Sequence, residues 1–184
     1  MDTFTRNAAF TVDVVAEEFD ADGKATKTTR SSMRVTRRDG KESRKLTKYE
    51  ENGVDLTEKK RSEIEKAESK PVHSPFLPSE QTKYRFTLLD AKDEHLRIGI
   101  EPAGKKDPEL ITGEAKVDPV RGEVRFVTMA PSKLPAFVDA LTLTGTFDER
   151  SMTKLTIKGV GGFLFIKKRF GVVTIFRDYE ARAD

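Results

Sequence analysis

Few residues of this sequence have the type and spacing that catalysis or metal binding requires. The chain has two histidines, His73 in a proline-rich stretch and His95 at the edge of a predicted strand, and neither has a second ligand at metal-binding spacing. It has no cysteine, which excludes disulfides, thiolate metal sites and cysteine nucleophiles. It also contains no nucleophile elbow and no phosphate-binding loop. The sequence therefore predicts no enzyme activity, no metal and no cofactor.

One glycine-rich run, Gly-Val-Gly-Gly at residues 159–162, superficially resembles a phosphate-binding loop. It lies inside a predicted strand and does not lead into a helix, as a phosphate-binding loop does. Glycine within a strand more often marks a bend, a bulge or a close backbone approach. We interpret the run as structural, at a point where the sheet curls.

Short basic runs at residues 37–38, 41–48 and 167–169 raise the question of nucleic-acid binding. Acidic residues such as Asp39 and Glu42 are interleaved with them and would cancel a stripe of phosphate contacts. The net charge of +3 is a small excess of 34 basic over 31 acidic side chains. Solvated strand faces explain the runs better, so no nucleic-acid partner is predicted.

The chain shows the two-residue periodicity of antiparallel strands, most clearly over residues 140–179. Leucines 141 and 143 have one parity there and threonines 142 and 144 the other, which gives a strand one wet and one dry face. Residues 148–151 and 167–169 are predicted as the polar turns of this three-stranded stretch. Earlier in the chain, residues 4–49 are predicted as a three-stranded meander with turns at residues 20–23 and 39–40, closed by Asn52-Gly53. A proline-rich linker at residues 71–78 precedes four further strands between residues 84 and 129.

These elements predict a mainly β fold for a single domain of residues 1–184. About ten strands form a curved antiparallel sheet, an unclosed half barrel, with one or few helices as a lid. The helix is predicted from Asp55, whose spacing to Glu58 suits a capping box, to Ser69, before Pro71. It is almost entirely charged and cannot fill a core. It is either a solvated connector or a cover over an opening in the sheet.

The apolar strand residues are predicted to lie on one side of the sheet, which the polar helix cannot cover. Because burial stabilises by about 25 cal/mol per Å² of apolar surface, such a face would bind a hydrophobic ligand or pack on itself as a closed core. The sequence leaves both possibilities open. The residues predicted to line an apolar, ligand-binding cavity are Phe10, Val12, Val14, Phe86, Leu88, Ile98, Ile100, Phe126, Leu141, Leu143, Phe147, Leu155, Ile157, Phe163, Phe165 and Ile175.

A second candidate surface is the hairpin predicted over residues 165–172. Its tip would carry Lys167, Lys168 and Arg169 beside Phe170. A basic and apolar tip suits contact with an anionic membrane surface or a partner, since each cation near the headgroups contributes about 1 kcal/mol. The alternative is an ordinary solvated turn with Phe170 folded back onto the sheet.

Four stretches resemble the LolA/LolB-like superfamily of bacterial outer-membrane lipoprotein-sorting proteins. They are YRFTLL at residues 84–89, LRIGIEP at 96–102, GEAKVDP at 113–119 and FRDY at 176–179. The resemblance implies an unclosed antiparallel barrel around an apolar cavity that holds acyl chains, with helices as the lid. It also implies a periplasmic or envelope location, with the signal peptide removed. The carriers have a gating arginine on an early strand, for which Arg30, Arg34 and Arg44 are candidates.

The sequence and the resemblance together predict a non-enzymatic envelope protein of outer-membrane biogenesis. It would bind a lipid, or the acyl chains of a lipoprotein, in its apolar concave cavity, as a carrier of the lipoprotein-sorting type. The alternative is an envelope sensor or protein-interaction module that uses the same scaffold without carrying lipid.

Overall fold

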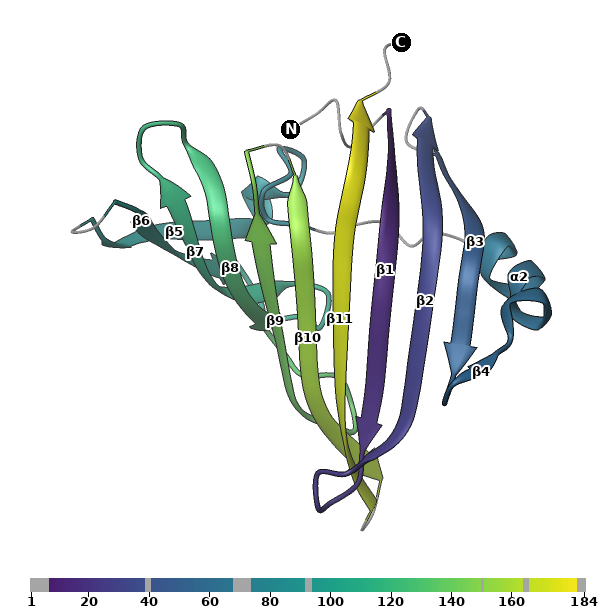
Figure 1. Ribbon diagram of the computed structural model, residues 1–184. Coiled ribbons are helices and arrows are strands. Elements are labelled where there is room, and N and C mark those ends of the chain that lie inside the picture. Colours follow the sequence, from purple (N-terminus) through teal and green to yellow (C-terminus); the bar gives the residue numbers. More distant parts are fainter. Residues whose placement is uncertain are drawn as a thin grey trace.

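The computed structural model describes residues 7–38, 41–67, 74–91, 94–149, 151–163 and 166–181. Eleven strands form one antiparallel sheet in the order β4-β3-β2-β1-β11-β10-β9-β8-β7-β6-β5 (Figure 1). Strands that follow each other in the sequence are neighbours in the sheet, except β4 and β5, and β1 pairs in addition with β11. The two edge strands, β4 and β5, do not pair with each other, so the sheet is curved but unclosed. The predicted fold class is confirmed.

The strands are longest in the middle of the sheet and shortest at its edges. No helix in the described part of the chain is both long and apolar enough to cross a membrane.

The elements are β1 (Ala8–Phe19), β2 (Ala25–Arg38), β3 (Lys41–Glu51), β4 (Val54–Asp55), α2 (Thr57–Lys66), the 3-10 helix η1 (Gln81–Lys83), β5 (Tyr84–Asp90), β6 (Leu96–Pro102), β7 (Ile111–Asp118), β8 (Glu123–Pro131), β9 (Val138–Phe147), β10 (Met152–Phe163) and β11 (Ile166–Ala181).

The early turns form where the sequence predicts them. Gly23 has a φ of 82°, and the Lys24 amide donates to Asp20 Oδ1 at 2.8 Å. Asn52 and Gly53 have φ values of 50° and 83°, as the two central residues of a type I′ hairpin turn require. The predicted turn at residues 39–40 lies outside the described residues.

Of the two turns predicted in the C-terminal stretch, one is confirmed and one is wrong. The Asp148 amide donates to the Ser151 carbonyl at 3.0 Å, which closes the first turn. The second turn is not at residues 167–169, because β10 and β11 remain paired as far as Phe163 and Ile166. The cations at 167–169 lie inside β11 with exposed side chains, so a strand accommodates the charges without burying them.

The start of α2 differs from the predicted capping box. Asp55 Oδ1 accepts the Thr57 amide at 2.8 Å, but Glu58 pairs with Arg61 at 2.9 Å and does not reach back to the start of the helix. The helix begins after Leu56 and continues to Lys66. Residues 68–69 of the predicted helix lie outside the described residues.

Helix α2 lies along β3, the strand next to the short edge strand β4 (Figure 1). A Glu65 carboxylate oxygen accepts the Leu46 amide of β3 at 2.9 Å, and Thr57 Oγ1 accepts the Tyr49 amide at 2.9 Å. None of the helix residues is buried. The helix thus occupies strand groups that would otherwise be open to pairing with another chain.

Two buried apolar clusters lie on the same face of the sheet, called the inner face here. The first cluster consists of Ala8, Phe10, Val12 and Val35, with Val14, Met33, Phe176 and Tyr179 packed against it. Phe76, from the segment that precedes η1, covers part of the second cluster. The second consists of Tyr84, Ile100, Ala115 and Val127, with Phe76, Leu110, Ile111, Val117, Val124, Met129 and Phe147 packed against it.

A bulge near the end of β11 brings Tyr179 to the inner face. Asp178 has a φ of 54°, and the β1–β11 register shifts between Ala9 and Thr11. The Tyr179 ring therefore stacks on Phe10, with 5.0 Å between ring centroids, and its hydroxyl donates to the Met152 carbonyl at 3.1 Å. Burial raises the pKa of this phenol.

Glu42 on the inner face joins two arginines beside the first cluster. Its carboxylate accepts from Arg44 at 2.8 Å and from Arg37 at 3.0 Å, and the Arg37 guanidinium lies 5.1 Å from the centre of the Phe10 ring. Burial raises the pKa of Glu42, but the hydrogen bonds from the two arginines outweigh it, so the net pKa lies below the ordinary 4.5. A carboxyl with a lowered pKa stabilises the fold above its unfolded-state pKa, and this contribution is lost as pH falls through the folded-state value.

We expect Glu42→Gln to lower the free energy of unfolding at pH 7 by about 1–3 kcal/mol, because two partly buried guanidinium groups lose a charged partner. The difference from wild type should shrink as pH falls through the lowered pKa of Glu42, because the wild-type carboxyl is then itself protonated. Urea unfolding at several pH values measures both effects. Glu101→Gln, at an exposed position, is the control and should change stability by less than about 0.5 kcal/mol. A loss that stays equal from pH 7 to a pH below the lowered pKa of Glu42 would contradict the electrostatic explanation.

Candidate ligand-binding surfaces

The strand register places most of the predicted cavity residues on the inner face. Side chains of directly paired residues share a face, and Ile157 of β10 pairs with both Leu143 of β9 and Val172 of β11. Following such pairs across the sheet connects the two buried clusters through β9 and β10. The predicted residues on the inner face are Phe10, Val12, Val14, Phe86, Leu88, Ile98, Ile100, Leu141, Leu143, Phe147, Leu155 and Ile157.

Two of the predicted residues lie on the opposite, outer face. Phe126 pairs with Thr146 and Lys116 and is 36% exposed, and Ile175 pairs with Asp13 and is 37% exposed. The expectation that they share the inner face is wrong.

The reason differs at the two positions. A register shift in the β7–β8 pairing separates Phe126 from Val124, so these two residues of equal parity lie on opposite faces. In β11 both parities are apolar, and it is Val172 and Phe176 that face inward. Phe165 and the side chain of Phe163 lie outside the described residues.

The middle of the inner face is an apolar strip that is only partly buried. The strip consists of Val14, Leu141, Leu143, Leu155, Ile157 and Val172, all of them intermediate in exposure.

The glycine run in β10 allows close packing on this inner face. A Cβ at Gly159 would lie 2.3 Å from Phe170 Cζ, so the Phe170 ring lies directly over the glycine. A Cβ at Gly161 would lie 2.6 Å from the Phe137 carbonyl oxygen, which accepts the Gly162 amide at 2.9 Å. The structural interpretation of the run is therefore confirmed.

The basic and apolar hairpin tip does not form as predicted. Lys167 pairs with Asp139 at 3.1 Å and Lys168 with Glu18 at 3.2 Å. Arg169 lies in the strand, and Phe170 is folded back onto the sheet. The structure thus has the alternative arrangement at Phe170, because the aromatic ring fills the space that Gly159 leaves open.

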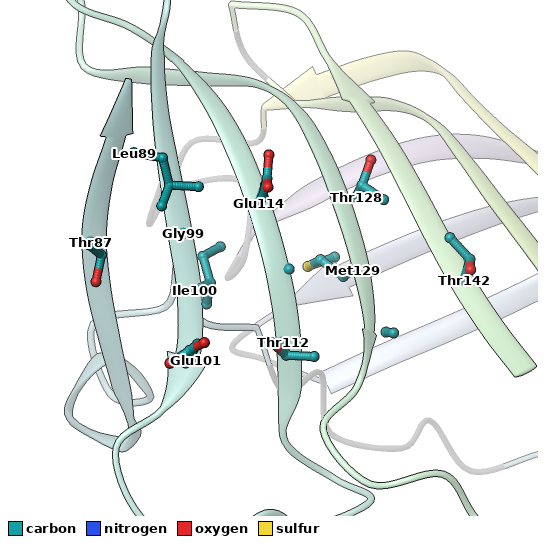
Figure 2. Close-up of a pocket in the computed structure, with 12 residues that line it drawn as sticks. Thr87, Leu89, Gly99, Ile100, Glu101, Thr112, Glu114, Thr128, Met129 and Thr142 are labelled. Atoms are coloured by element: carbon teal, nitrogen blue, oxygen red, sulfur yellow. The ribbon is translucent and has the colours of Figure 1, made fainter. Parts of the chain in front are cut away.

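The outer face carries a hollow of mixed polarity over β5 to β9, with a volume of about 560 Å³. Figure 2 shows threonines from four strands around it, together with Glu101 and Glu114. Glu114 is paired with Arg97 at 2.7 Å. Leu89, Met129 and Ala130 also line the hollow, so its lining is mixed in polarity. Its threonines are Thr87, Thr112, Thr128 and Thr142.

A second outer hollow, of about 480 Å³, lies over β1, β9, β10 and β11 and is mainly apolar. This hollow was not predicted, because the two-residue periodicity was taken to give each strand a single dry face. The signal was present in residues 171–176, Gly-Val-Val-Thr-Ile-Phe, which are apolar at both parities. Its outer-face lining residues are Val15, Glu17, Phe19, Ala140, Thr142, Thr156, Lys158, Val160, Arg169, Gly171 and Val173.

In the described part of the chain, no group of three or more metal-binding side chains is close enough to hold an ion. His73 lies outside the described residues, and His95 is partly buried. Of the three arginines proposed by resemblance, only Arg44 lies on the inner face, where it pairs with Glu42. Arg34 lies on the outer face and pairs with Glu180 at 2.8 Å. Arg30 also lies on the outer face.

Comparison with known proteins gives fold-level likenesses only. No family model and no curated protein matches the sequence. Among solved structures, a LolA superfamily protein from Nitrosomonas europaea is similar at 11% identity over 99% of this chain and 90% of that chain, with a TM-score of 0.42.

Two further neighbours are complexes. The MucA/MucB complex of Pseudomonas aeruginosa is 9% identical over 99% of this chain and 96% of that chain, with a TM-score of 0.27. A structure of MucB with MucA(peri) is 8% identical over 96% of this chain and 94% of that chain, with a TM-score of 0.24. At these values the likenesses carry no argument about ligand or partner.

Proposed function

We propose that this protein is a non-enzymatic binding protein of the bacterial envelope that holds acyl chains of a lipid or lipoprotein on its inner face. The central apolar strip is the observation that carries the proposal. It presents leucine, isoleucine and valine from four adjacent strands, and these side chains remain partly exposed. An acyl chain on the strip would remove that apolar surface from water, at about 25 cal/mol per Å².

The arrangement of the covering elements supports the proposal. Helix α2 lies at the β3 edge, and Phe76 packs against the cluster on β5 to β8. Neither of them is placed over β9 and β10, where the strip is centred. The residues of the strip are intermediate in exposure, and a bound ligand would reduce that exposure.

A second candidate function is recognition of a protein segment by the edge strand β5. Among the described strands β5 pairs with β6 alone, so it is an edge strand of the sheet to which a further strand can be added. Phe86 and Leu88 on the strand are 41% and 58% exposed. An extended peptide added to this edge would gain main-chain hydrogen bonds and apolar contacts. It would leave the central strip unoccupied, which distinguishes the two candidates.

Methyl NMR spectra of the isotopically labelled protein test the proposal, with a diacylated lipopeptide as the added ligand. We expect saturable shifts at the methyl groups of Leu141, Leu143, Leu155 and Ile157, because the acyl chains would contact them. Ile175 on the outer face is the internal control and should not shift. Shifts confined to β5, or none at saturating ligand, would contradict acyl binding on the inner face.

A further inference from the structure

We propose that the apolar hollow on the outer face is a separate site for a single-chain anionic amphiphile such as a free fatty acid. The acyl chain would lie in the hollow, and the headgroup would contact Lys158 and Arg169. The site is on the opposite side of the sheet from the central strip, so it does not depend on the function proposed above.

The floor of this hollow is Gly171, a strand glycine with no side chain to fill the space. A Cβ built there meets only the edge of the Phe19 ring, at 3.9 Å. Gly171 pairs with Glu17 on one side and Lys158 on the other, so their Cα atoms are separated by two strand spacings, about 9.6 Å. The glycine therefore leaves an open space between the side chains of β1 and β10.

The walls of the hollow suit a hydrocarbon chain. Val15 and Val173 are direct partners across β1 and β11, and Phe19 lies two rows further along β1. Val160 of β10 completes the apolar lining. All four side chains are only partly buried. The volume of about 480 Å³ is within the range of small-molecule sites.

The charges around the hollow favour an anion. Lys158 and Arg169 are exposed, and neither is in an ion pair within the part of the chain that the structure describes. The neighbouring lysines differ, because Lys167 and Lys168 are paired with acids. One carboxylate, Glu17, also lines the hollow and reduces the net charge of these three residues to +1. A carboxylate headgroup would complement the two unpaired cations, whereas a neutral headgroup would not.

Displacement of the fluorescent fatty acid cis-parinarate by oleate or oleyl alcohol tests the proposal. The measurement is made on the wild type and on Leu143→Glu, which carries a charge on the inner face and leaves the outer hollow intact. We expect oleate to compete at least tenfold better than oleyl alcohol in Leu143→Glu, and this preference to weaken at high salt. Equal competition by the neutral alcohol would overturn the assignment of the cations.

Substitutions in the hollow locate the site. In the Leu143→Glu background, Gly171→Leu should weaken cis-parinarate binding at least tenfold, because the new side chain occupies the acyl position. The double substitution Lys158→Met and Arg169→Met should weaken cis-parinarate binding several-fold and remove its salt dependence, whereas Glu17→Gln should tighten binding.

Unchanged binding in Gly171→Leu, or in the double variant if Gly171→Leu does not fold, would overturn the proposed site. Binding to phosphatidylglycerol vesicles without displacement by oleate would also overturn it, in favour of a membrane contact. Failure here leaves the lipopeptide experiment on the inner face unaffected.

Discussion

Replacing Gly113 with alanine is expected to lower the free energy of unfolding by about 3 kcal/mol or more. A Cβ at this position would lie 2.1 Å from the Thr128 carbonyl oxygen and 2.8 Å from Met129 Cα. Both contacts are with backbone atoms of β8, so no side-chain rotation relieves them. Strands β7 and β8 would have to separate, with loss of ladder hydrogen bonds and of packing around Ile100, which is fully buried and pairs with Gly113.

The matched control is Gly171→Ala, also a glycine inside a long strand. Its Cβ would meet nothing closer than 3.9 Å, so we expect no loss of stability and a gain of up to about 1 kcal/mol from the reduced freedom of the unfolded chain. Urea denaturation of the two variants beside the wild type measures the difference. Equal stabilities of Gly113→Ala and Gly171→Ala would contradict the prediction, because they would show that a Cβ fits between β7 and β8 at residue 113.

Local signals allowed much of this fold to be predicted. Asn52-Gly53 specifies a hairpin turn by itself, because both residues tolerate a positive φ. The alternation of leucine with threonine in β9 predicts the face of each side chain without knowledge of the rest of the sheet. Polarity also predicted that α2 would not fill the core, and none of its residues is buried.

Features that depend on distant partners could not be predicted. The pairing of β1 with β11 joins the two ends of the chain, and no local pattern indicates it. Bulges reverse the expected face, as for Phe126, and Asp178 brings Tyr179 to the inner face. In β11 both the odd and the even residues are apolar, so the periodicity does not predict which of them face inward. Ile175 was therefore assigned to the wrong face.

The sequence predicted many of the residues of the inner-face site correctly, but it did not predict where the cations of β11 lie or that the outer face has an apolar hollow. Leu143 and Ile157 lie on the inner face as expected, because strict alternation holds in β9 and β10. The cations at 167–169 were expected in a turn, since charge runs are common there, but in β11 alternation simply sends them to opposite faces. The outer hollow depends on Gly171 lying between two side chains from other strands, which only the register reveals.

The second large effect is expected from a charge on the central strip. Leu143→Glu should weaken binding of a diacylated lipopeptide at least 100-fold, which corresponds to about 2.8 kcal/mol. An acyl chain over this position would bury the new carboxylate without a partner, and such burial costs several kcal/mol. Leu143 is only partly buried in the free protein, so the same charge can remain solvated there and the fold should survive.

Thr144→Glu is the control that isolates the face of the sheet. It places the same charge on the adjacent residue of β9, whose side chain lies on the outer face opposite Thr156. We expect this variant to bind the lipopeptide as the wild type does. Thermal melting of both variants confirms that each is folded before binding is compared.

Titration of the wild type, Leu143→Glu and Thr144→Glu with a fluorescent diacylated lipopeptide is therefore the most direct test of acyl binding on the inner face. Saturable binding by the wild type and Thr144→Glu, with at least a 100-fold loss in Leu143→Glu, is the predicted result. Absence of saturable binding by the folded wild type, or equal binding by all three proteins, would contradict the proposal.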